Sequence, residues 1–123
     1  MRVPGFLARQ FIVAGSLRNT PTGFAVGARN PIGDGMLVGI GHIRIDGVDV
    51  TPDQITATRE GEDAVHRATD VSPAAPVAFR KGDEVTFHVE GLRLDPGDHL
   101  LEVELVELNI GQVIVGITER LAV

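Results

Sequence analysis

Residues 79–108 constrain the fold most, because polar and apolar side chains alternate along two consecutive segments. In the first segment Thr86, His88 and Glu90 alternate with three apolar residues: Val85, Phe87 and Val89. This period of two predicts a β-strand with one buried face. The sequence Asp-Pro-Gly-Asp at 95–98 predicts a turn, and residues 100–108 alternate again as a second strand. The best-specified part of the chain is therefore scaffold, and we expect its function to depend on a partner.

Length and composition favour one cytoplasmic domain, residues 1–123. A chain of this size can bury a core without metal or disulfide staples. Cysteine is absent, which excludes disulfides, thiolate chemistry and cysteine-based zinc sites. No apolar run approaches the roughly 20 residues of a membrane helix. Arg9 and Gln10 would interrupt the apolar region of a signal peptide.

The charge pattern disfavours nucleic acid as a partner. The net charge is −6, from 17 acidic and 11 basic residues, and the basic residues are scattered. Five Phe with no Trp or Tyr leave no stacking surface for bases or sugars, which argues against an autonomous carbohydrate-binding module. Fifteen Gly and seven Pro indicate many turns. Together these features favour an all-β protein.

The whole chain predicts a single-domain antiparallel β-sandwich of about eight strands, with a jelly-roll topology also possible and the strand order open. Residues 1–8 are expected to be a flexible or docking tail. Asp46-Gly47 predicts a hairpin, and residues 51–54 a turn or one helical turn. Further strands are predicted at residues 9–13, 24–29, 40–45, 55–59 and 113–121, with a short one near 64–69.

Residues 30–39 are predicted to be a long loop, and its apolar side chains are unusual because loop tips are normally polar. The loop either folds back over the edge of the core or inserts into a groove of a partner. Methionine packs adaptably at interfaces. The candidate substrate- or partner-facing residues are Asn30, Pro31, Ile32, Met36, Leu37 and Val38.

We predict neither catalytic residues nor a metal site in this chain. No two of the four histidines (His42, His66, His88 and His99) have the short spacing of metal ligands. The aspartate pairs at 46–49 and 95–98 are explained as turns rather than calcium loops. The serines lie outside any G-x-S-x-G elbow. The glycines at 33–35 and 39–41 precede a predicted strand, whereas a phosphate-binding loop precedes a helix.

The order of several short motifs resembles the small β subunit of bacterial C-glycoside deglycosidases, also called C-glycosyl lyases. These motifs are Ser-Leu-Arg-Asn at 16–19, Ile-Asp-Gly at 45–47 before a short strand at Val50, and the stretch from Gly91-Leu92 to Gly97-Asp98-His99. The resemblance covers residues 12–118. The second strand and the loop after it carry fewer aromatic residues than is usual in that family.

The resemblance implies an all-β accessory subunit bound to a larger TIM-barrel α subunit of the sugar-isomerase type. The α subunit would hold Mn²⁺ or Mg²⁺ and the acid–base residues, and this chain would hold no cofactor. The implied substrate is a 3-oxo-C-glycoside, whose C–C bond to an aromatic aglycone is broken by proton abstraction and elimination. Loop 30–39 would then pack near the mouth of the barrel, with Ile32, Met36 and Leu37 lining the aglycone side.

Two other classes of function are also compatible with the sequence. The chain could be a stand-alone β-sandwich binding module, which would behave as a monomer. It could also be a cupin-like metal enzyme that uses three of its histidines, although their spacing does not favour this. An exposed apolar loop would distinguish the subunit from the stand-alone module, since soluble monomers rarely expose large apolar patches.

Overall fold

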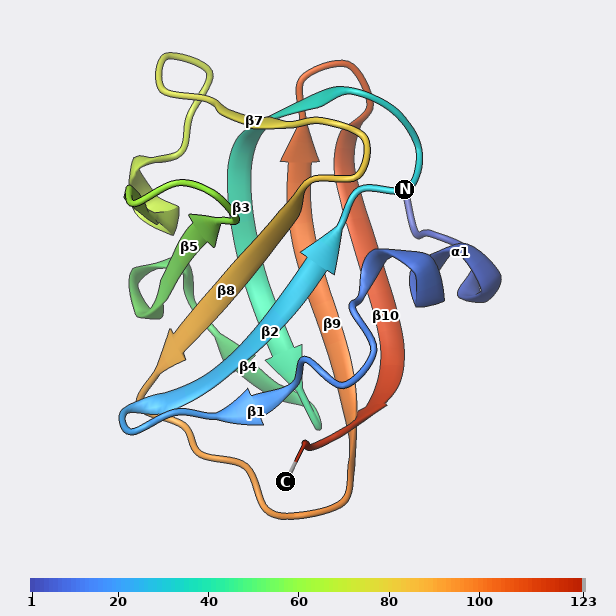
Figure 1. Cartoon of the computed structure of the whole chain (residues 1–123), viewed down its shortest axis with the longest axis vertical. Coiled ribbons are helices and arrows are strands. Elements are labelled where there is room, and N and C mark those ends of the chain that lie inside the picture. Colours follow the sequence, from blue (N-terminus) through green and yellow to red (C-terminus); the bar gives the residue numbers. More distant parts are fainter. Residues whose placement is uncertain (123) are drawn as a thin grey trace.

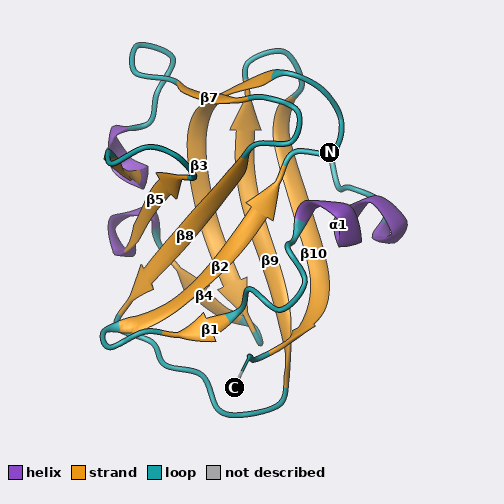
Figure 2. Cartoon of the chain, viewed as in Figure 1, coloured by secondary structure: helices purple, strands orange, loops and turns teal. Residues whose placement is uncertain are grey.

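The chain folds into two five-stranded antiparallel sheets that lie one over the other (Figure 1). The structure is a computed structural model that describes residues 1–122. Strands dominate and helix is limited to short segments (Figure 2). One continuous apolar core lies between the sheets, and Phe24, Phe87, Ile43 and Leu101 are fully buried in it. The predicted all-β, sandwich-like architecture is therefore confirmed.

The first sheet has the order β1-β2-β8-β5-β6. Its strands are β1 (Arg18–Asn19), β2 (Gly23–Arg29), β8 (Glu84–Glu90), β5 (Ile55–Arg59) and β6 (Val65–Arg67). The second sheet has the order β10-β9-β3-β4, and β7 pairs with the first residues of β3. Its strands are β10 (Gly111–Arg120), β9 (Asp98–Glu107), β3 (Gly35–Ile45), β4 (Val48–Val50) and β7 (Val77–Phe79).

The two strongly alternating segments form β8 and β9, but these strands lie in opposite sheets. β8 pairs with β2 and β5, whereas β9 pairs with β10 and β3. Residues 91–97 therefore carry the chain from one sheet to the other, and Gly97 has the positive φ expected of the turn. Alternation decides which face of a strand is buried, because that depends on side chains alone. It does not decide which strand lies alongside.

The short elements follow their local sequence signals. Asp46 and Gly47 both have positive φ, as a two-residue hairpin between β3 and β4 requires. The predicted helical turn after Thr51 is η1 (Pro52–Gln54), which starts with proline. The irregular region after β5 contains β6 and a second 3₁₀ turn, η2 (Ala68–Asp70).

The N-terminal segment is neither a strand at 9–13 nor a flexible tail at 1–8. The strand predicted at 9–13 is wrong, since α1 (Gly5–Phe11) occupies most of that range. Ala8 and Phe11 are its buried side chains, and their spacing of three puts them on one helical face against the core. Residues 1–3 are not a flexible tail either, because Val3 N–H donates to Ile114 O at 2.9 Å and Ile114 N–H donates to Met1 O at 2.9 Å.

His99 ties two connections together at the end of the sandwich where β9 begins. Its Nδ1 lies 2.5 Å from Asp46 Oδ2, and its Nε2 lies 2.6 Å from Asp95 O. Asp46 also accepts the Leu100 N–H at 2.9 Å. Since both ring nitrogens face acceptors, the doubly protonated imidazolium fits best. The hydrogen bond to Asp46, and then that to Asp95, raise the pKa of His99 above its ordinary 6.5.

We expect the free energy of unfolding to fall as the pH rises through the raised pKa of folded His99. Its contribution is full below 6.5, the unfolded value, and is lost above the folded one. His88 acts in the opposite direction, because burial lowers its pKa and protonation below 6.5 therefore destabilises the fold. Urea titrations from pH 5.5 to 9 should show that His99→Gln removes only the alkaline decline. In contrast, His88→Gln should change only the acid side. An unchanged alkaline decline in His99→Gln would contradict this assignment.

Candidate partner-binding pocket

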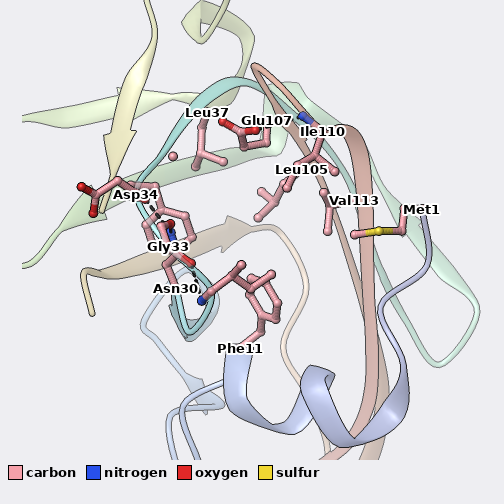
Figure 3. Close-up of a pocket in the computed structure, with 13 residues that line it drawn as sticks. Met1, Phe11, Asn30, Gly33, Asp34, Leu37, Leu105, Glu107, Ile110 and Val113 are labelled. Atoms are coloured by element: carbon pink, nitrogen blue, oxygen red, sulfur yellow. Dashed lines mark hydrogen bonds between the residues drawn. The ribbon is translucent and has the colours of Figure 1, made fainter. Parts of the chain in front are cut away.

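An apolar pocket of about 110 Å³ opens at the opposite end of the sandwich, where the loop after β2, the β9–β10 turn and the N-terminus meet (Figure 3). Most of its wall is aliphatic or aromatic, and its polar side chains are Asn30, Asp34 and Glu107. The lining residues are Met1, Phe11, Asn30, Ile32, Gly33, Asp34, Gly35, Leu37, Phe79, Leu105, Glu107, Ile110 and Val113.

Asn30 is a buried structural residue at the base of this pocket. Its Nδ2 donates to the carbonyls of Gly33 and Phe79, each at 2.6 Å, and its Oδ1 accepts the Ile32 N–H at 3.0 Å. These bonds fold the loop back on itself and fasten it to β7. Because the amide is used in these internal bonds, its evident role is to support the loop.

The predicted ten-residue loop is wrong in extent, because β3 begins at Gly35. Met36, Leu37 and Val38 are strand residues, and Leu37 is only 2 % exposed. Of the six candidate residues, the pocket brings together Asn30, Ile32 and Leu37. Pro31, Met36 and Val38 do not line it. Ile32, which is 49 % exposed, is the large apolar side chain that this loop offers to solvent.

The glycines after Leu37 explain why strand β3 looked like a loop. The pairing of β3 with β9 shifts register between Leu37 and Gly39 and again between Ile40 and Ile43. A Cβ on Gly39 would lie 3.2 Å from the Val106 side chain, and one on Gly41 would lie 2.9 Å from Glu104 Oε2. Here glycine allows close approach within a bulged strand, rather than a turn.

The rest of the pocket comes from residues that were not predicted to be part of a site. Ile110, 49 % exposed, lies at the tip of the β9–β10 turn beside exposed Leu108. An apolar turn tip is the same signal that singled out Ile32, so these residues could have been found. Phe11, Phe79, Leu105 and Val113 are ordinary core positions of four separate elements. No local pattern indicates that they meet.

Glu107 holds the wall of the pocket together through backbone hydrogen bonds. Its Oε2 accepts the Met36 N–H at 3.0 Å, and its Oε1 accepts the N–H groups of Asn109 at 2.8 Å and Ile110 at 3.0 Å. The bond from Met36, followed by those from the turn, lowers the pKa of Glu107. The carboxylate therefore fixes the β9–β10 turn against β3, and both of its oxygens already accept hydrogen bonds from the backbone.

Several other charged side chains form ion pairs away from the pocket. On the second sheet, Arg44 Nη1 lies 2.7 Å from Glu104 Oε1, and His42 Nδ1 lies 2.7 Å from Asp49 Oδ2. Arg2 Nη2 lies 2.5 Å from Glu102 Oε2. In the described part of the chain, no three His, Cys, Asp or Glu side chains are placed to hold a metal ion. The aliphatic and aromatic wall of the pocket is suited to packing against an apolar group.

A family model described as hydroxymethylglutaryl-CoA reductase, N-terminal domain, matches residues 7–122. The chain belongs to this family. The matched range contains both sheets and every residue that lines the pocket except Met1. No curated protein matches the sequence. Within residues 1–122, no helix is both long and apolar enough to span a membrane.

Replacing Asn30 by Asp should lower the free energy of unfolding by about 1–3 kcal/mol, because a carboxylate cannot donate to the Gly33 and Phe79 carbonyls. Asn109→Asp, in an exposed turn, is the matched control and should change stability by less than about 0.5 kcal/mol. Urea denaturation of both variants measures the difference. Equal stabilities would contradict the structural role of Asn30.

Glu107→Gln should cost about 1–2 kcal/mol of stability, since the amide nitrogen cannot accept the N–H bonds that one carboxylate oxygen now receives. Because the pKa of Glu107 is lowered, its contribution is present above pH 4.5 and is lost as the pH falls through the folded value. Glu60→Gln, on an exposed side chain, serves as the control. Thermal melts from pH 7 downward should show a difference between the variants that shrinks as the pH falls through the folded pKa of Glu107.

Proposed function

We propose that this chain is the accessory β subunit of a heteromeric C-glycoside deglycosidase, with catalysis in a TIM-barrel α subunit. The observation that carries the proposal is the apolar rim of the pocket. Ile32 and Ile110, each 49 % exposed, project from neighbouring turns, and Met1 adds a third exposed apolar side chain. A soluble domain rarely keeps such a cluster uncovered, so a partner surface is its most economical explanation. The resemblance of the motif order supports the identity of that partner.

The reaction would break the bond between the anomeric carbon of a 3-oxo-sugar and a carbon of an aromatic aglycone. A base of the α subunit removes the proton at C2, whose acidity comes from the neighbouring 3-keto group. The electrons of the C2–H bond form the C1–C2 double bond, and those of the C1–aglycone bond go to the ring carbon, which takes up a proton. Bound Mn²⁺ or Mg²⁺ in the α subunit would supply Lewis-acid stabilisation of the enolate.

The role of this chain in that reaction would be to cover the α subunit and exclude water. Exclusion of water strengthens electrostatic stabilisation of a developing enolate. Leu37 cannot serve as a covering side chain, because it is only 2 % exposed. Met36 is a partly exposed residue of β3 that does not line the pocket, so the apolar rim must come from elsewhere. Ile32 and Ile110 take that place.

The pocket is better suited to one apolar side chain of the partner than to the substrate. Small-molecule sites usually measure about 300–1,000 Å³, and this pocket measures about 110 Å³. Its polar groups are satisfied by the protein itself, as shown for Asn30 and Glu107. We therefore expect an aliphatic or aromatic anchor from the α subunit to enter between Ile32 and Ile110. Buried anchors of this kind dominate the affinity of protein interfaces.

The family match favours a second candidate, in which the chain works as a domain of a hydroxymethylglutaryl-CoA reductase. This alternative predicts a different ligand: hydroxymethylglutaryl-CoA, rather than a 3-oxo-C-glycoside, would be expected to stabilise the assembled protein. A thermal-shift measurement with hydroxymethylglutaryl-CoA and, separately, with a 3-oxo-C-glycoside would distinguish the two candidates. A stable monomer that responds to neither ligand would favour a stand-alone binding module.

Co-expression with a neighbouring TIM-barrel gene should give a defined hetero-oligomer that cleaves 3-oxo-C-glycosides in the presence of Mn²⁺. Ile32→Glu and Ile110→Glu should each weaken the complex at least about tenfold, because each buries a charge in an apolar contact. Val65→Glu is the matched control, since Val65 is also exposed but lies on β6 in the other sheet. Size-exclusion chromatography with mass determination and product analysis provide the measurements.

The result that would overturn the proposal is a wild-type chain that elutes alone beside a folded α subunit. A complex that forms but shows no cleavage with Mn²⁺ or Mg²⁺ would remove the deglycosidase activity. Equal weakening by Val65→Glu would show that the apolar rim is not the contact.

A further inference from the structure

β10 forms an unusually long free edge for this fold. It has ten residues and lies at the end of the second sheet, beside β9 alone. The other terminal strands are short: two residues in β1 and three each in β4, β6 and β7. Proteins usually shorten or cover their sheet edges, because unpaired backbone groups there can pair with another chain. A ten-residue edge such as that of β10 is therefore expected to be covered by another segment.

The N-terminal segment covers only the first half of this edge. Met1 N donates to Gln112 O at 2.7 Å, and residues 1–3 form a parallel bridge at Ile114. The backbone groups of Gln112 and Ile114 that bond residues 1–3 point away from β9. Because this direction repeats every two residues along a strand, the backbone groups of residues 116, 118 and 120 also point away from β9. The Arg120 N–H is capped by Glu119 Oε1 at 3.0 Å. In residues 1–122, the outward N–H groups of Gly116 and Thr118 have no protein acceptor.

The covering segment stops because of its own sequence. Pro4 lacks an N–H, and α1 begins at Gly5, so the chain turns away from β10 after Val3. This leaves a groove of about 400 Å³ between the α1 segment and the edge. It is lined by Gly5, Arg9, Ile12 and Ala14 on one side and by Gly116, Ile117, Thr118 and Glu119 on the other. α1 stands beside β10 in Figure 1.

We propose that the β10 edge at Gly116–Thr118 accepts an extended segment of the α subunit as an added strand. Addition of a strand supplies affinity through main-chain hydrogen bonds, and the groove provides space for the side chains of that segment. A second copy of this chain fits less well, since α1 flanks the edge and would obstruct the approach of a whole sheet. A single extended segment can lie between α1 and the strand.

This inference rests on the proposed function and places a second contact beside the first. Met1 lines the apolar pocket and also pairs with β10 at Gln112. The pocket and the free edge are therefore joined through the N-terminal segment on one flank of the molecule. A partner that places an anchor between Ile32 and Ile110 could run an adjacent segment along β10.

The decisive variant is Thr118→Pro in the full chain, co-expressed with the α subunit. Proline removes the outward N–H of Thr118 but no bond to β9, because that group points away from the sheet. Thr118→Val is the matched control, since it changes the side chain and keeps the N–H. We expect Thr118→Pro to raise the Kd of the complex at least about tenfold and Thr118→Val to leave it within about twofold, by isothermal titration.

Amide hydrogen exchange gives a readout that does not depend on the variants. In the wild-type complex the Gly116 and Thr118 amides should exchange at least about tenfold more slowly than in the free chain. A complex in which Thr118→Pro binds as tightly as Thr118→Val, or in which these amides exchange as before, would overturn the inference and leave the proposed function standing. Absence of any complex with the wild-type chain would remove both.

Discussion

Strand β9 is the element on which the rest of the structure depends. It pairs along its length with β10 on one side and with β3 on the other, and its inward side chains Leu101, Val103 and Leu105 lie in the core. Both of its ends are fixed by side-chain hydrogen bonds: His99 joins two connections at one end, and Glu107 fastens a turn to β3 at the other. The long strand β9 thereby connects the hydrogen bonds of His99 at one end of the sandwich to the apolar pocket at the other.

Much of this fold could be predicted because strands and tight turns leave local traces in the sequence. The alternation in β8 and β9, the Asp46-Gly47 hairpin and the proline at the start of η1 each follow from one short segment. Two local signals predict the wrong structure: the glycines in β3 indicate a loop, and the apolar residues at 9–13 indicate a strand. Bulges in β3 and the spacing of Ala8 and Phe11 on α1 account for what the structure has instead.

The candidate site was harder to predict than the fold, because it is assembled from distant parts of the chain. Ile32 carries a visible signal, as does Ile110, since each is apolar within a turn. Phe79 and Val113 look like ordinary core residues, and only the order of strands brings them to the same pocket. Sequence reasoning therefore identified one side of the pocket and could not supply the other. The covering of β10 by residues 1–3 is likewise a tertiary feature with no periodic pattern.

The hydrogen bonds of Asn30 and Glu107 have a consequence for the kind of recognition that the pocket can offer. Both side chains spend their polar capacity on neighbouring backbone, and Glu107 keeps its charge across the neutral range because its pKa is lowered. A partner side chain that enters the pocket therefore contacts a mainly apolar wall, and the charge of Glu107 in that wall does not change near neutral pH. Although the chain carries a net charge of −6, the affinity of the pocket for a partner side chain should vary little with ionic strength or with pH near neutrality. The acidic surface can then govern how fast a partner arrives, while the pocket governs how long it stays.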